Sequence, residues 1–152
     1  MLFRSLGDSI DGASALLTGA FRENSVELEV EPRARESIVR ADPVLLEQVL
    51  VNVLSNAVDA IAQGGKPGRV TIADESDGIG KTVFSVTDNG AGFSVIEPDM
   101  ALDPFVTSKD VGDGIGLGLS ISYNIMTGMG GSLRLEHGIG SGARVIASLP
   151  EG

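Results

Sequence analysis

Two glycine clusters carry the residue types and spacings of this chain that could do chemistry. The first lies in SVTDNGAGF (residues 85–93), where Asp88 ends an apolar stretch and glycines follow at once. A carboxylate accepts hydrogen bonds, so it suits an exocyclic amino group such as that of adenine and does not attract phosphates by itself. The second, GDGIGLGLSIS (112–122), exposes closely spaced backbone amides just before a predicted helix, where they can hold an anion. Together the clusters suggest a nucleotide site, although the first alone is equally typical of a turn.

Two asparagines, Asn52 and Asn56, lie one turn apart on a helix predicted for residues 43–63. Asp42 suits the cap of this helix, Pro43 suits its first position, and glycines 64 and 65 end it. The face opposite its apolar side carries polar residues, and it fits a solvated surface. Asparagine is a poor helix former, however, and amide oxygens are ligands that Mg²⁺ accepts beside waters and phosphates. The apolar side holds Leu46, Val49, Leu50, Val53, Leu54, Ala57 and Ile61, and the polar side holds Gln48, Asn52, Asn56 and Asp59.

Helical and alternating patterns both occur along the chain, which favours a mixed α/β fold. We expect helices at 5–21, 43–63 and 116–129, strands at 25–31, 37–42, 131–137 and 142–149, and a β-hairpin formed by 68–76 and 81–88. The segment from 89 to 115 is rich in glycine and long enough to be a functional loop.

Composition limits the possible partners. The 152 residues suit one domain, and 42% of them are apolar, enough for a core. A net charge of −10 argues against nucleic acid, so an anionic nucleotide would have to be held by backbone amides and a divalent cation. Cysteine is absent, which excludes disulfides and thiolate metal sites. We see no signal peptide and no apolar run near 18 residues, and therefore expect a soluble chain without membrane contact.

Five segments resemble, in order, the N, G1, F, G2 and G3 boxes of the GHKL ATPases, and most closely the catalytic ATP-binding domain of bacterial sensor histidine kinases. They are the asparagine-bearing helix, DNGAGF, DPFVTSK, GDGIGLGLSI and GIGSGARVIASLP. The resemblance covers roughly residues 25–150, and its finer pattern is similar to the subgroup of C4-dicarboxylate and nitrogen sensors. It implies an α/β two-layer sandwich, a mixed β-sheet covered on one face by helices, with ATP between helices under a mobile lid at about 94–115.

The resemblance also implies roles for single residues. Asn56 would bind Mg²⁺, Asn52 would support the metal or the phosphates, and Lys109 could approach the triphosphate; these three would be the catalytic residues. Asp88 would accept from the adenine amino group, and Phe105 would anchor the lid. Further contacts to ATP are implied for Asp59, Gly90, Gly92, Thr107, Gly114, Gly116, Leu117, Gly118, Leu119, Gly140 and Gly142.

Two residues depart from the family pattern. Asp59 stands where many histidine kinases have Lys or Arg to touch phosphate. Ala143 stands where Thr or Ser often follows the GxG of the third glycine box. The acidic side chain would have to turn away from the metal or act through water. Either change could lower the affinity for ATP.

The phosphoacceptor is expected outside this chain. Hydrolysing relatives use a glutamate where Asn52 stands, and an amide has no useful basicity, so attack by water should be slow. The only histidine, His137, is predicted at a strand end before glycines, whereas family phosphoacceptors lie on an exposed helix. We therefore expect 25–152 to be the catalytic domain of a longer kinase and 1–24 to be a helix connecting it to a histidine-bearing dimerisation domain.

The implied partners are that dimerisation domain and a downstream response regulator. We expect a cytoplasmic, monomeric domain whose parent kinase can be anchored in the inner membrane. Three alternatives stay open: a serine kinase of the anti-sigma type, a hydrolysing GHKL ATPase, and an interaction module that has lost nucleotide binding.

Overall fold

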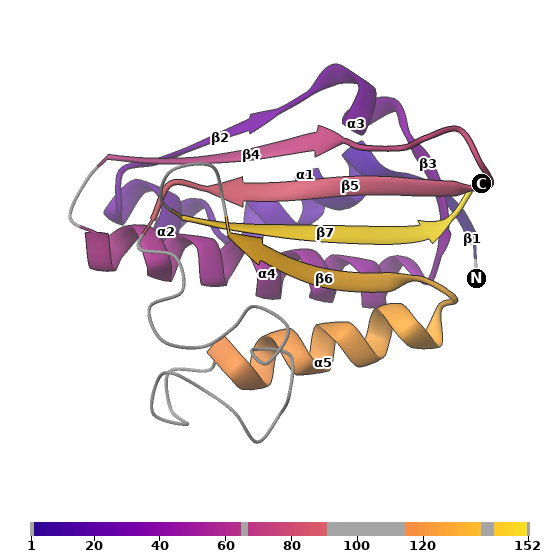
Figure 1. Cartoon of the computed structure of the whole chain (residues 1–152). Coiled ribbons are helices and arrows are strands. Elements are labelled where there is room, and N and C mark those ends of the chain that lie inside the picture. Colours follow the sequence, from indigo (N-terminus) through magenta and orange to yellow (C-terminus); the bar gives the residue numbers. More distant parts are fainter. Residues whose placement is uncertain (1, 65–66, 91–114, 138–141, 152) are drawn as a thin grey trace.

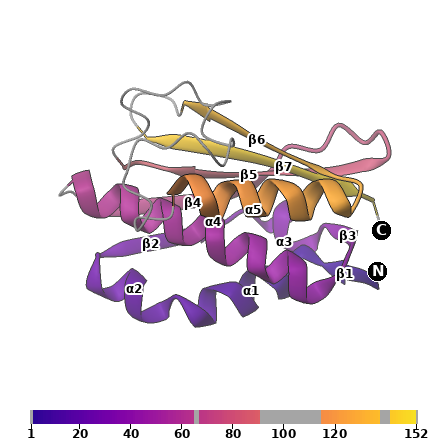
Figure 2. The ribbon, with the colours of Figure 1, turned by 90° about the horizontal axis from the view of Figure 1, so that it is seen from below.

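The computed structural model describes residues 2–64, 67–90, 115–137 and 142–151, without the side chains of 63, 64, 115–118 and 137. A five-stranded sheet forms one layer, and helices on one of its faces form the other (Figures 1 and 2). The sheet order is β2-β4-β5-β7-β6; β2 and β4 are parallel and the other pairs are antiparallel. The predicted mixed sheet covered on one face is therefore confirmed. The strands are β2 (Val26–Val30), β4 (Gly68–Asp74), β5 (Lys81–Asp88), β6 (Ser132–His137) and β7 (Ala143–Pro150).

The helix α4 (Pro43–Gly64) runs along the middle of the helical layer, between α1 (Leu6–Leu16) and α5 (Ile115–Gly128) (Figure 2). It begins as predicted, because Oδ1 of Asp42 accepts hydrogen bonds from the amides of Val44 at 2.9 Å and Leu45 at 3.2 Å. Two short helices, α2 (Thr18–Glu23) and α3 (Pro32–Glu36), flank β2 in the chain.

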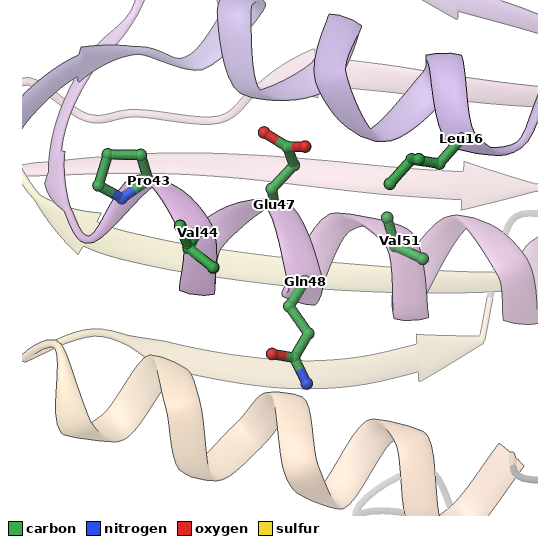
Figure 3. A pocket seen from close by; sticks show the side chains of 6 residues that line it. All are labelled: Leu16, Pro43, Val44, Glu47, Gln48 and Val51. Atoms are coloured by element: carbon green, nitrogen blue, oxygen red, sulfur yellow. The ribbon is translucent and has the colours of Figure 1, made fainter.

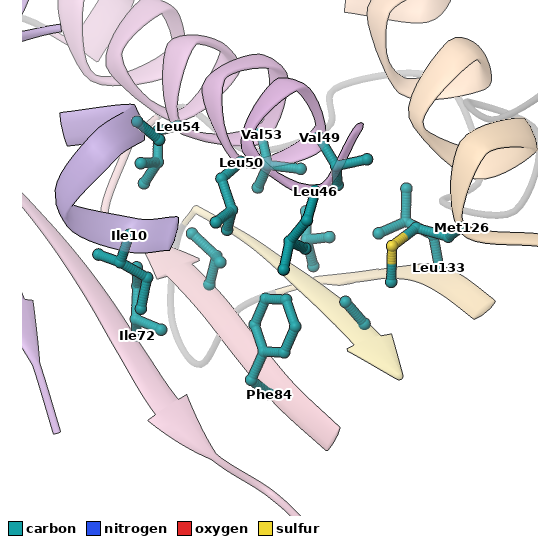
Figure 4. Packing of buried hydrophobic residues seen from close by; sticks show 14 of the residues in the cluster. Ile10, Leu46, Val49, Leu50, Val53, Leu54, Ile72, Phe84, Met126 and Leu133 are labelled. Atoms are coloured by element: carbon teal, nitrogen blue, oxygen red, sulfur yellow. The ribbon is translucent and has the colours of Figure 1, made fainter. Parts of the chain in front are cut away.

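The predicted apolar face of α4 forms the centre of the core (Figure 4). It packs on the sheet through Ile72 and Phe84, on α5 through Met126, and on α1 through Ile10. Full burial of each such large side chain stabilises the fold by about 1.5–3 kcal/mol. All seven residues predicted for this face are buried: Leu46, Val49, Leu50, Val53, Leu54, Ala57 and Ile61.

The helix predicted for 5–21 is wrong in its extent. Residues Leu2–Ser5 form a strand, β1, that pairs antiparallel with β3 (Ile38–Ala41) in a separate two-stranded sheet. The hydroxyl of Ser5 accepts from the amide of Asp8, so α1 starts only after Ser5, and Leu17 leaves helical geometry at φ −109° and ψ 6°. A strand partner more than thirty residues away cannot be read from local periodicity.

The residues before position 25 are part of the folded body. Leu6, Ile10 and Ala13 on α1 are almost completely buried in the core beside α4. Removing this segment would expose apolar surface of α4, so it contributes to stability as well as to any connection. The link to an upstream dimerisation domain stays a prediction.

One expectation about the membrane needs correction. Over Pro43–Ala62, α4 is long and apolar enough to cross a membrane, although no such run was expected. Its polar residues are too few to offset the many Val, Leu, Ile and Ala residues in the mean hydropathy of the stretch. Half of this stretch is buried inside the domain, which identifies α4 as a core helix of the fold.

Candidate functional site

The asparagine face of α4 lies toward α5. Nδ2 of Asn52 donates to Oγ of Ser122 on α5 at 3.2 Å, and Ser122 is completely buried. Gln48, one turn earlier, is exposed, and its side chain extends in the same direction (Figure 3). The face is therefore partly covered by a second helix, which a simple solvated stripe would not be.

Asn56 lies one turn further along α4. The residue is half-buried, and its Nδ2 is buried without a hydrogen-bond partner among the described residues. Leaving a buried donor unpaired costs about 1–3 kcal/mol, so this position fits a polar ligand. The same planar amide can present its oxygen after rotation, and amide oxygens suit Mg²⁺. The chemistry of Asn56 therefore fits the metal role that the resemblance implies.

Asp59 lies near the end of the same helix and is exposed to solvent. Water and salt around an exposed carboxylate weaken its repulsion of a nearby phosphate. This exposure reduces the conflict between its charge and a triphosphate.

Asp88 ends β5 with its side chain in the core layer, 7% exposed. Its Oδ1 accepts from the amide of Gly90 at 2.9 Å and from the amide of Ala143 at 3.4 Å. Burial raises the pKa of this carboxyl group above its usual value, and the two backbone hydrogen bonds partly oppose that rise. Among the described residues both bonds end on Oδ1, so the second carboxylate oxygen is the atom that can accept from a ligand.

Two glycines allow the backbone to pack around Asp88. A Cβ at Gly90 would lie 2.6 Å from the backbone nitrogen of Ile61 on α4, and one at Gly142 would lie 2.1 Å from the carbonyl oxygen of Asp88. Gly142 also has φ +99°, which favours glycine. The turn after β5 therefore touches α4 about one helical turn beyond Asn56.

Two contributions were missed by reasoning from the sequence. Ala143 was noted only for its missing hydroxyl, yet its backbone amide helps to hold Asp88. Ser122 was not singled out. It stands three residues after Leu119 and four before Met126, both buried, so a polar residue at a core-facing helical position was the available signal.

The second glycine box opens α5. The backbone is helical from Ile115, so Gly116, Leu117 and Gly118 lie in its first turn, and Leu119 is buried in the core. His137 ends β6, where it pairs with Ala143, as predicted for a strand-end histidine. The other predicted contacts lie outside the described residues: Gly92, Phe105, Thr107, Lys109, Gly114 and Gly140, with all of the lid except its last residue.

The described part of the chain has no acidic metal cluster, and its apolar groove contains few of the residues considered above. Within the described ranges, no group of three or more His, Cys, Asp or Glu residues could hold a metal, so a cation there would need amide or nucleotide oxygens. A groove of about 380 Å³ lies between the end of α1 and the start of α4, lined by Leu16, Val44 and neighbours (Figure 3). Apart from Gln48, it contains none of the polar residues considered above.

Residues 41–152 match the family described as histidine kinase-, DNA gyrase B-, and HSP90-like ATPases. The chain belongs to this family. The match includes α4, β5, α5 and β7, the elements that carry the candidate site. The resemblance noted in the sequence is thereby confirmed.

Two similar proteins are named as sensors. The chain is 34% identical to the two-component sensor PprA of Pseudomonas aeruginosa over 93% of its own length and 16% of that protein. It is also 34% identical to the C4-dicarboxylate transport sensor protein DctB of the same organism, over 97% of its length and 24% of that protein. The chain thus spans about a quarter or less of these relatives.

The catalytic domain of histidine kinase ThkA, solved without nucleotide, has a similar fold. The TM-score is 0.80 at 27% identity, and the alignment covers 99% of this chain and 95% of that domain. The part shared with the sensor kinases is therefore the catalytic ATPase domain, with the α/β fold of histidine kinase catalytic domains.

Proposed function

We propose that this chain binds Mg²⁺-ATP beside α4 and transfers the γ-phosphoryl group to a histidine on a separate dimerisation domain. The observation that carries the proposal is the contact of the turn after the buried Asp88 with α4 at Ile61, about one helical turn beyond Asn56, in a histidine kinase-like ATPase domain. The parent protein would be a two-component sensor kinase with a response regulator downstream, and this domain would work in the cytoplasm.

Each group has a distinct task in this proposal. Asp88 accepts from the adenine amino group through its second oxygen, while Oδ1 stays bonded to Gly90 and Ala143. Asn56 and Asn52 would hold Mg²⁺ and the phosphates, and Lys109 and the amides at the start of α5 would add positive charge. When bound, Mg²⁺ supplies charge neutralisation at the phosphates, which is the main requirement of phosphoryl transfer.

The hydrogen bonding and the low basicity of the Asn52 amide disfavour hydrolysis of ATP. This amide donates to the buried Ser122 hydroxyl, and an amide cannot take a proton from water. Transfer instead needs a positioned nucleophile, which an upstream histidine helix would supply. His137 is a poor candidate because its backbone is tied into the ladder with Ala143 at the end of β6.

The test is labelling with γ-labelled ATP in the presence of Mg²⁺. We expect the chain alone to bind ATP in calorimetry, to release little phosphate and to take up no acid-labile label. A separate fragment carrying the histidine helices of the parent kinase should become labelled when it is added. Transfer in trans should be much slower than in the intact kinase because tethering raises the effective concentration.

Four outcomes would overturn the proposal, each in a different way. Strong labelling of the chain that is lost in His137→Gln would make it self-phosphorylating. Phosphate release at about 1 s⁻¹ or faster would make it a hydrolysing ATPase. Label on serine of an added partner would make it a serine kinase, and failure to bind ATP would make it an interaction module.

A further inference from the structure

We infer that Ser122 is a positioning residue that holds the amide of Asn52 in place for nucleotide and thereby couples α4 to α5. The inference rests on the proposed nucleotide site, in which Ser122 has no contact with the nucleotide or the metal. Its structural basis is the hydrogen bond from Nδ2 of Asn52 to Oγ of Ser122, which joins residues 70 positions apart.

The burial of Ser122 makes this hydrogen bond energetically important. Ser122 is 0% exposed and lies on the side of α5 that carries Leu119 and Met126 into the core. A hydroxyl in such a place is unfavourable unless it is hydrogen-bonded, whereas an apolar residue would pack there without that requirement. The contact with Asn52 satisfies the hydroxyl at the boundary between the two helices.

The bond also restricts the terminal torsion of the Asn52 side chain, which the helical backbone does not fix. The terminal torsion of an asparagine side chain is broad, so the amide plane of an unbonded residue can rotate. Fixing Nδ2 against α5 fixes the direction of Oδ1 as well, because the amide is planar. A preorganised polar group loses less freedom when it contacts phosphates or hydrated Mg²⁺.

The two asparagines, Asn52 and Asn56, therefore differ in the hydrogen bonding of their side-chain amides. Asn52 is held by the neighbouring helix, while Nδ2 of Asn56 finds no partner in the described part of the chain. In addition, α5 starts at Ile115, directly in the second glycine box, about two turns before Ser122. The bond thus links the orientation of Asn52 to the position of the helix whose start is proposed to face the phosphates.

The experiment is a double-mutant cycle on Mg²⁺-ATP affinity, measured by calorimetry with Ser122→Ala, Asn52→Ala and the pair. A neutral hydrogen bond corresponds to a factor of about two to ten in an equilibrium constant, so Ser122→Ala should weaken binding about threefold to tenfold. In the Asn52→Ala background the same change should have less than about a twofold effect, because the group that Ser122 orients is gone. Ser122→Thr keeps a hydroxyl and should recover affinity if it folds.

Controls separate orientation from general stability. Ser148→Ala removes another buried hydroxyl that bonds a hydroxyl on a neighbouring element, Ser132 at 2.7 Å, and should leave ATP affinity unchanged. Without nucleotide, the side-chain amide protons of Asn52 should exchange faster in Ser122→Ala than in the wild type, by nuclear magnetic resonance. Thermal unfolding of each variant checks that the domain is folded at the titration temperature.

The possible results are distinct. Wild-type protein that does not bind ATP contradicts the proposed function. Wild-type binding with unchanged affinity in Ser122→Ala, or an equal loss in the presence and absence of the Asn52 side chain, overturns the positioning role alone. Unchanged exchange of the Asn52 amide in Ser122→Ala would also overturn it.

Discussion

Replacing Asp88 by asparagine should remove adenine recognition while keeping the fold. The asparagine Oδ1 can still accept from the amides of Gly90 and Ala143, so the local backbone keeps its partners. Its Nδ2 then meets the adenine amino group, and two donors cannot bond each other. A hydrogen bond to a charged group contributes about 1.5–3 kcal/mol, which corresponds to a loss of about 10-fold to 150-fold in ATP affinity.

Calorimetric titration of Asp88→Asn with Mg²⁺-ATP measures this loss, and thermal unfolding without nucleotide provides the control. We expect unfolding at or above the wild-type temperature, because the substitution removes a buried charge. Asp88→Ala is a less specific variant, since it leaves two backbone amides without their acceptor and should also destabilise the turn. Discrimination between ATP and GTP should shrink in Asp88→Asn, because its amide can donate to the guanine carbonyl. Wild-type affinity for ATP in a folded Asp88→Asn protein would refute the adenine contact.

Three further predictions concern the metal, the backbone and the pH dependence. Asn56→Ala should remove most of the Mg²⁺ dependence of ATP binding, seen by comparing titrations with Mg²⁺ and with EDTA; equal Mg²⁺ dependence in both proteins would contradict the metal role. Gly142→Ala should destabilise the domain strongly in urea unfolding, because its Cβ would lie 2.1 Å from the Asp88 carbonyl oxygen at φ +99°, whereas Gly19→Ala, with open space around its Cβ, should be neutral or slightly stabilising. Because the folded-state pKa of Asp88 is raised, this group stabilises the folded state below its usual value of 3.8 and loses that contribution as the pH rises through the raised pKa. The stability advantage of Asp88→Asn over the wild type should therefore grow with pH across that range, while wild-type ATP affinity should fall as the pH is lowered through it; parallel stability curves would contradict the shift.

The residues of the site that short stretches of sequence define could be predicted. Asp88 before a glycine turn and the two asparagines one turn apart could be recognised from short stretches, because residue type and spacing alone define them. The partners of these residues were not predictable in the same way. Ser122 meets Asn52 only because α5 packs beside α4, and Ala143 meets Asp88 only because β7 pairs with β5.

The sequence by itself determined the elements whose signals lie within a few residues. The cap at Asp42, the apolar spacing of α4 and the alternation of β4 and β5 specify those elements through local hydrogen bonding and the pattern of burial. Only the tertiary structure decided that β1 is a strand, that β2 runs parallel to β4, and that the asparagine face lies against α5. The reason is physical: strand pairing and helix packing depend on partners dozens of residues away, whose contacts form only when the chain buries its apolar surface as a whole.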